Sequence, residues 1–135
     1  MTTMNRRLGA LTAMLAAPAL IMLGTATAYA GTDLQSLVPT PSNTQRTDGP
    51  NSIRENGINE HFLVNGAPGD VMNSYKSALE GQGWNVTVAN SGRGGATFTG
   101  TNGSAYGVFT GGGWGTTTDI QACAWPTKPS NTHCG

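Results

Sequence analysis

Two cysteines are the residues whose chemistry is easiest to assign from this sequence. Cys123 and Cys134 lie near the C-terminus, on either side of a segment that contains Pro126 and Pro129. In an exported chain such a pair forms a lasting disulfide. Closing this short loop contributes about 3 kcal/mol in the loop-entropy model. A metal site of Cys123, His133 and Cys134 is the alternative, but adjacent histidine and cysteine are a poor ligand spacing. We expect a disulfide and neither a metal nor another cofactor.

The histidines and carboxylates do not form a recognisable catalytic motif. A serine hydrolase needs a nucleophile, a base and an orienting group, and the chain has no Gly-x-Ser-x-Gly sequence. His61 alternates with Phe62 in an expected strand and is interpreted as a surface residue of the sheet. Asp119 lies inside an expected strand, where partial burial would favour acid–base chemistry. We assign no catalytic residue, and the alternative is a small secreted hydrolase that uses His61 or Asp119.

One tryptophan is a candidate for recognition. Trp114 lies at the fourth position of residues 111–115, whose other members are all glycine, so local packing cannot bury its ring. Exposed tryptophans are common at recognition sites. We expect Trp114, with Tyr106 and His61, to contact a ligand or partner, which would be a protein or a glycan of the cell envelope. The alternative is that Trp114 folds back over the sheet edge as a lid on the core.

The first 30 residues are typical of a signal peptide. Arg6 and Arg7 precede an apolar run of 16 residues at 8–23, and the Ala-Tyr-Ala triplet at 28–30 suits signal peptidase. The run is shorter than the roughly 20 residues that span a bilayer. We expect cleavage after Ala30 and a secreted or cell-wall-associated protein without a stable membrane anchor. An uncleaved anchor is the alternative.

Composition after residue 30 excludes several classes of protein. Five basic and seven acidic groups remain there, which gives a net charge of 5 − 7 = −2, and they are scattered along the chain. Nucleic-acid binding and a polybasic membrane surface are therefore not expected. The same part of the chain holds 18 of the 20 glycines, which is more than twice the usual content of about 7%. This excess predicts glycine-rich loops and excludes a helical bundle.

The hydrophobic pattern predicts a single α+β domain at residues 58–135. A helix begins at Pro68 and is ended by Gly81 and Gly83, and Val71, Tyr75 and Leu79 form its apolar stripe. We expect strands at 58–64, 85–88, 96–101, 106–109 and 116–125, with hairpins joining the later ones.

These elements predict one small sheet, mixed or mostly antiparallel, of four to five strands. A single helix covers one of its faces, and the C-terminal disulfide stabilises the domain. Because the helix joins the first two strands, they are expected to be parallel neighbours.

Residues 31–57 are expected to form an irregular or disordered segment. Their large apolar residues are Leu34, Leu37, Val38 and Ile53, too few to order the segment. A single helical turn is compatible with residues 33–37. The segment would act as a linker or as a strap along the domain.

Two stretches resemble small uncharacterised secreted proteins of actinobacteria, of the mycobacterial type. One runs from Tyr75 to Trp84 with the sequence YKSALEGQGW, and the other is CAWPTKP, which begins at Cys123 and is followed by Cys134. The resemblance covers residues 58–135 and implies no known activity. The leader and the lack of an assembled catalytic motif suggest an exported non-catalytic binding or accessory module of the cell envelope or the extracellular space. A structural or inhibitor-like module, with the disulfide tail as its contact, is a further alternative.

Overall fold

The computed structural model describes residues 31–134, so the expected signal peptide at 1–30 lies outside the described part. The elements in that part are α1 (Gly31–Leu37), β2 (Thr44–Ile53), β3 (Gly57–Asn65), α2 (Pro68–Gly81), β4 (Asn85–Gly92), β5 (Gly95–Asn102), β6 (Ala105–Trp114) and β7 (Thr117–Trp125). No helix between residues 31 and 134 is long and apolar enough to cross a membrane.

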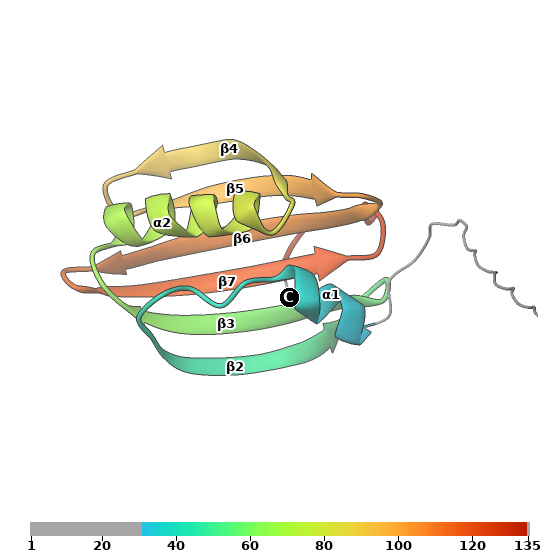
Figure 1. Cartoon of the computed structure of the whole chain (residues 1–135), viewed down its shortest axis with the longest axis horizontal. Coiled ribbons are helices and arrows are strands. Elements are labelled where there is room, and N and C mark those ends of the chain that lie inside the picture. Colours follow the sequence, from blue (N-terminus) through green and yellow to red (C-terminus); the bar gives the residue numbers. More distant parts are fainter. Residues whose placement is uncertain (1–30, 135) are drawn as a thin grey trace, which may run out of the picture.

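All six strands of the described chain belong to one antiparallel sheet, in the order β2-β3-β7-β6-β5-β4. Both helices lie on the same face of this sheet (Figure 1). The α+β class and the C-terminal disulfide are confirmed. The expected size is wrong, because the described residues form six strands and two helices instead of four to five strands and one helix.

Local signals at its two ends define α2. Pro68 occupies the first turn, where its missing N–H leaves no hydrogen bond unmade. At the other end, the amide of Trp84 donates to the carbonyl of Leu79 at 3.0 Å, and the amide of Gly83 donates to that of Glu80 at 3.1 Å. Gly83 has a φ of 101°, the left-handed conformation that this type of helix ending requires. The helix therefore begins and ends where the sequence predicts.

The expectation that the first two strands of the domain are parallel neighbours is wrong. β3 lies between β2 and β7 and is antiparallel to both, whereas β4 forms the opposite edge of the sheet. The pairing of β3 with β7 places Phe62 beside Ile120, both fully buried. A helix connection permits parallel pairing without requiring it, and here the apolar match between β3 and β7 decides the order.

The segment expected to be irregular, residues 31–57, instead contains α1 and β2. A helix with its side chains is about 10–12 Å wide, whereas six strands spaced about 4.8 Å apart extend over about 24 Å. α2 alone cannot cover such a sheet, so α1 packs on β3 beside it (Figure 1). Leu34 and Val38 from this segment are buried in the core.

Hydrogen bonds from α2 and the residues after it fix the N-terminal segment in place. Trp84 donates its indole Nε1–H to the carbonyl of Leu37 at 2.7 Å. The hydroxyl of Tyr75 donates to the carbonyl of Pro39 at 2.9 Å. These bonds pair backbone carbonyls that would otherwise be unsatisfied where the segment leaves α1.

Aromatic rings fill the space between the helices and the sheet. The ring centroid of Phe109 lies 5.1 Å from that of Trp84 and 6.2 Å from that of Tyr75, both edge to face. At Gly107, an added Cβ would lie 2.5 Å from Phe109 Cζ and 3.0 Å from Trp84 Cη2. Glycine is required at this position because the rings lie directly on the strand.

Substitution of Leu34 tests whether the N-terminal segment is part of the core. Leu34→Ala should lower the free energy of unfolding by about 2–5 kcal/mol, because it leaves a cavity at a fully buried position. The exposed neighbour offers a matched control, since Gln35→Ala should change it by no more than about 0.5 kcal/mol. Urea denaturation of both variants measures the difference, and equal stabilities would contradict the packing of α1.

Candidate functional site

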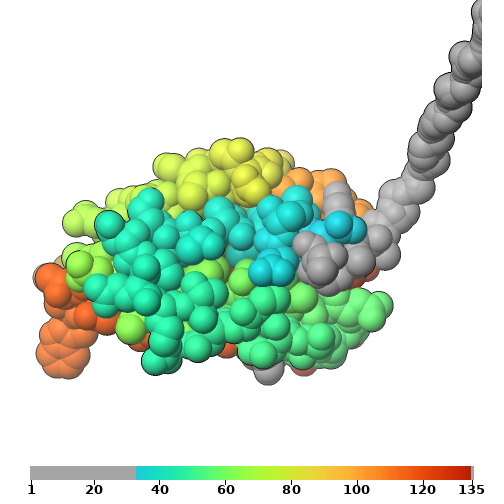
Figure 2. All heavy atoms as spheres, turned by 60° about the horizontal axis from the view of Figure 1, so that its bottom comes forward, coloured from blue at the N-terminus to red at the C-terminus, as the bar shows by residue number. Residues whose placement is uncertain are grey.

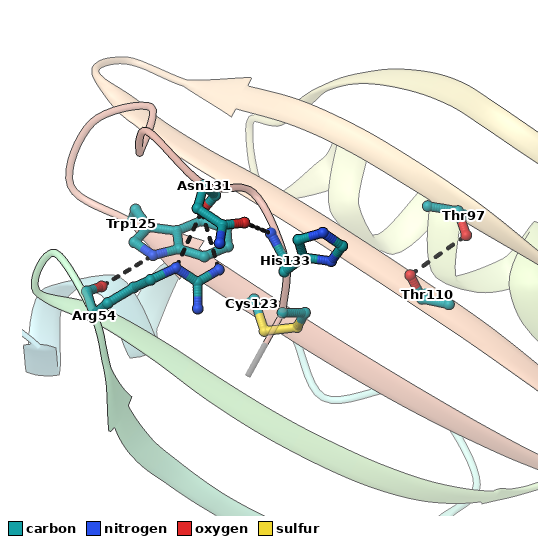
Figure 3. Close-up of a disulfide and its surroundings, with 8 residues drawn as sticks. Arg54, Thr97, Thr110, Cys123, Trp125, Asn131 and His133 are labelled. Atoms are coloured by element: carbon teal, nitrogen blue, oxygen red, sulfur yellow. Dashed lines mark hydrogen bonds between the residues drawn. A yellow bond between two sulfur atoms is a disulfide. The ribbon is translucent and has the colours of Figure 1, made fainter.

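The two faces of the sheet differ in chemistry. The face under α1 and α2 carries the apolar core. The other face, called the open face below, carries mostly polar residues and is covered at one end by the C-terminal tail, residues 126–134. Figure 3 shows the tail and its disulfide on this side, with Thr97 and Thr110 uncovered farther along the sheet.

The covered end of the open face holds a small apolar cluster. Cys123 and Trp125 are fully buried there beside Val108, and Ile53, Tyr106 and Cys134 pack around them. The predicted disulfide between Cys123 and Cys134 is present, with Cα atoms 5.6 Å apart. It fastens the tail over the C-terminal end of β7.

The turn between β2 and β3 holds the tail as well. The Glu55 carboxylate accepts hydrogen bonds from the Ser130 hydroxyl, at 2.9 Å, and from the Ser130 amide, and these bonds lower the pKa of Glu55. The Arg54 guanidinium donates to the carbonyl of Asn131 at 3.0 Å, while the Arg54 carbonyl accepts from Trp125 Nε1 at 3.1 Å. Figure 3 shows these last contacts. Glu55 has a φ of 56°, which is uncommon for a residue other than glycine.

Tyr106 belongs to this covered end. Its ring centroid lies 6.4 Å from that of Trp125, and Lys128 Nζ from the tail lies 5.5 Å from the centre of the Tyr106 ring. Tyr106 and Trp114 stand at opposite ends of β6, separated by about 27 Å at 3.4 Å per residue. The structure therefore does not bring these two candidate contact residues into one site.

Trp114 is exposed, and the lid alternative is wrong. Its side chain keeps 89% of its accessible surface. It occupies the last position of β6, paired with Thr117, so it forms the end of a strand instead of the expected loop. Strand alternation places it on the same face as Thr110. Figure 2 shows the orange end of the β6–β7 hairpin protruding from the body of the molecule.

Beyond the tail, the open face carries a continuous line of polar side chains across the whole sheet. One residue from each strand takes part, and each is in register with the next. We call this line the polar row; in sheet order it consists of Asp48, His61, Gln121, Thr110, Thr97 and Asn90. Its members are half-buried or exposed, so their hydroxyl, amide, imidazole and carboxylate groups can contact a ligand.

His61 lies between two carboxylates in this row. Its Nδ1 is 3.5 Å from Asp48 Oδ2, and its Nε2 is 3.1 Å from Asp119 Oδ1. Arg46 in turn contacts Asp48 at 3.1 Å. The carboxylates lie at opposite ends of the imidazole, so a single metal ion could not be bound by all three groups.

This arrangement does not resemble a hydrolytic site. A catalytic histidine uses one ring nitrogen to contact an orienting carboxylate and the other to take the proton of a nucleophile. In His61 both ring nitrogens face carboxylates. Asp119 is largely exposed, with 57% of its side-chain surface accessible, which differs from the partial burial expected for it.

The buried carboxylate of the sheet is Glu60. It lies on the core face of β3, between Ile58 and Phe62 in the alternation, and is 4% exposed. Within residues 31–134 its Oε1 has no hydrogen-bond partner. Burial raises the pKa of Glu60. The sequence indicates this burial, because Glu60 lies two residues from Ile58 and two from Phe62 and therefore points to the same face of the strand as these apolar residues.

A row of glycines runs beside the polar row. Gly112, Gly95 and Gly92 are in register on β6, β5 and β4, and each is two residues along its strand from a member of the polar row. We call them the glycine row. On β6, Gly112 separates Thr110 from Trp114. An added Cβ at Gly112 would lie 3.1 Å from the carbonyl oxygen of Gly94, a tight contact, and within 4 Å of no other atom outside its chain neighbours.

Neither row could be found from the sequence alone. The polar row depends on which strands are neighbours and on their register, and its members come from all six strands of the described sheet. Single threonines, asparagines and glutamines in strands have no distinctive local pattern. Of the expected contact residues, the sequence identified His61 and Trp114 on the uncovered part of this face.

The raised pKa of Glu60 predicts a pH-dependent stability. Because the folded protein holds the proton more tightly than the unfolded chain, whose carboxyl titrates near 4.5, stability falls as the pH rises from 4.5 through the pKa of the folded state. Glu60→Gln should therefore be more stable than the original protein at pH 7 and equally stable near pH 4. Chemical denaturation at the two pH values measures this.

The exposed helix residue Glu80 provides the control. It forms a surface ion pair with Lys76 at 2.9 Å, which contributes little to stability. Glu80→Gln should leave stability nearly unchanged at both pH values. A Glu60→Gln variant whose stability difference is the same at pH 4 and pH 7 would contradict the burial of an ionisable carboxyl at this position.

No protein-family model matches the chain, and comparisons with characterised proteins and with solved structures give no match. The resemblance to secreted actinobacterial proteins therefore stays a prediction. The interpretation of the open face rests on its own geometry.

Proposed function

We propose that this chain is an exported, non-catalytic binding protein of the cell envelope or the extracellular space, and that the uncovered part of the open face is its binding surface. The observation that carries the proposal is the exposure of Trp114, 89% of whose surface is accessible. A tryptophan side chain can bury 150–250 Å², and here that surface contributes almost nothing to folding. Such residues are enriched among those that dominate binding energies.

The surroundings of Trp114 support the same function. The polar row and the glycine row lie on the face to which Trp114 belongs. An aromatic ring beside an array of hydrogen-bonding groups gives a surface both affinity and orientation. The other exposed large apolar residue in the described chain, Val88, is 45% exposed and lies near α2. Polar side chains such as Asn73 and Lys76 lie near it, but Val88 is only about half as exposed as Trp114.

Export is supported by the disulfide. Cys123 and Cys134 are paired, and disulfides persist in oxidising compartments outside the cytosol. The apolar leader at residues 1–30 acts as the signal peptide that directs the chain to export. Whether the protein stays in the wall or diffuses away is decided by what it binds.

Two other functions receive less support from the geometry. A hydrolase that uses His61 or Asp119 would need a ring nitrogen directed at a nucleophile, but both nitrogens face carboxylates. An inhibitor-like module would present its disulfide tail to a partner. Here Arg54 and Glu55 bind the tail backbone, and the disulfide packs on the sheet.

Affinity capture from the envelope fraction of the producing organism tests the proposed function. Residues 31–135, immobilised, should retain envelope components, and Trp114→Ala should reduce their recovery at least about fivefold, because the substitution removes the main apolar contact. The stability of this variant should be within about 0.5 kcal/mol of the original, since the residue is exposed.

Val88→Ala is the matched control, because it removes the other exposed large apolar side chain. Recovery by this variant should equal that of the original protein. Equal recovery by the original protein and the Trp114→Ala variant would remove the Trp114 end of the open face as a binding surface.

A further inference from the structure

The glycine row forms the floor of a shallow trough on the open face. Gly92, Gly95 and Gly112 carry no side chains, while Thr97 and Thr110 of the polar row line one side. A depression beside Asn90, Thr97 and Thr110 extends over this part of β4–β6. On β6, Gly112 and Trp114 continue the open face beyond this depression, and the positions of Thr110 and Trp114 are about 14 Å apart along the strand.

The side chains that line this trough on β4, β5 and β6 are uncharged. Asn90, Thr97 and Thr110 supply hydroxyl and amide groups, and the two threonine hydroxyls lie 3.4 Å from each other. Each hydroxyl both donates and accepts hydrogen bonds, and the amide does the same through separate atoms. A ligand that matches them must itself present many neutral donors and acceptors at short intervals.

The charged groups of the open face lie on β2, β3 and β7, where Asp119 is in register with Gly112 of the glycine row, and they offset one another. Arg46 contacts Asp48, and His61 lies between Asp48 and Asp119. This cluster produces no strong positive field that would attract a polyanion. Its carboxylates can still accept hydrogen bonds from a neutral ligand.

From these features we infer that the trough binds a neutral glycan chain, with one sugar ring stacked on Trp114 and the chain lying across the strands toward Thr97 and Asn90. A pyranose ring has an apolar C–H face that suits the indole and a rim of hydroxyls that suits threonine and asparagine. The inference rests on the proposed function and names the ligand class of the same surface. A protein partner fits less well, because the interface would lack an apolar centre around Trp114.

Native affinity electrophoresis through gels that contain a soluble polysaccharide tests this inference. The probes are dextran, laminarin, mannan, galactan and arabinan, all neutral, with dextran sulfate as the charged counterpart of dextran. At least one neutral polysaccharide should retard the protein, and retardation gives the dissociation constant. Binding to dextran sulfate alone would overturn the inference in favour of a polyanion site.

Three substitutions locate the site. Trp114→Ala should weaken binding at least about tenfold through loss of the stacking ring. Thr110→Val, which keeps the side-chain shape but loses the hydroxyl, should weaken it by about two- to tenfold. Gly112→Val should weaken it by placing a branched side chain on the trough floor. Val88→Ala should bind as the original protein does, and equal effects of Val88→Ala and Trp114→Ala would overturn the placement.

Tryptophan fluorescence supplies a readout that does not depend on mobility. Trp84 and Trp125 are 3% and 0% exposed, so acrylamide should quench mainly Trp114. A saturating polysaccharide that retards the protein should lower the quenching constant toward that of the Trp114→Ala variant. Retardation without protection of Trp114 would overturn the stacking geometry.

The two proposals can fail separately. If none of the neutral polysaccharides retards the protein while envelope capture still depends on Trp114, the glycan inference is overturned and the proposed function stands. If capture does not depend on Trp114 either, both are overturned.

Discussion

The need to cover one face of a six-stranded sheet determines most of this structure. The side of the sheet that carries Phe62, Phe109 and Ile120 must be shielded from water, and α2 lies over only part of its width. The N-terminal segment supplies the missing cover with Leu34 and Val38. Indole and phenol hydrogen bonds to the backbone at Leu37 and Pro39 then hold this segment against α2, so the two covers form one layer.

Because both described helices pack on one face, the other face stays largely uncovered between residues 31 and 134. In the described part of the chain the tail alone packs on it, at the end where Cys123 and Trp125 are buried. Over the rest of this face, the antiparallel register aligns the residues of the polar row. The neighbouring glycine row carries no side chains. The same backbone alternation that buries one set of side chains therefore arranges the other set in rows across the strands.

Local patterns predicted the elements whose signals are contained within a few residues. Pro68 and Gly83 bound α2, and Asn102-Gly103 forms a hairpin turn. β2 lacks such a pattern, because its residues are almost all exposed and β3 alone pairs with it. The exposure of Trp114 could be proposed from its glycine neighbours, whereas the polar row requires a strand order that no short segment specifies.

The pairing of β3 with β7 imposes an order of assembly on the chain. Ile58 lies opposite Ala124, so the centre of the sheet joins two segments separated by almost the whole domain, and closing such a loop is entropically costly and slow. Until β7 is available, the β2–β3 hairpin and the β4–β5–β6 meander have no strand between them. The sheet of a chain that folds from its N-terminal side therefore stays incomplete until β7, Thr117–Trp125, is available.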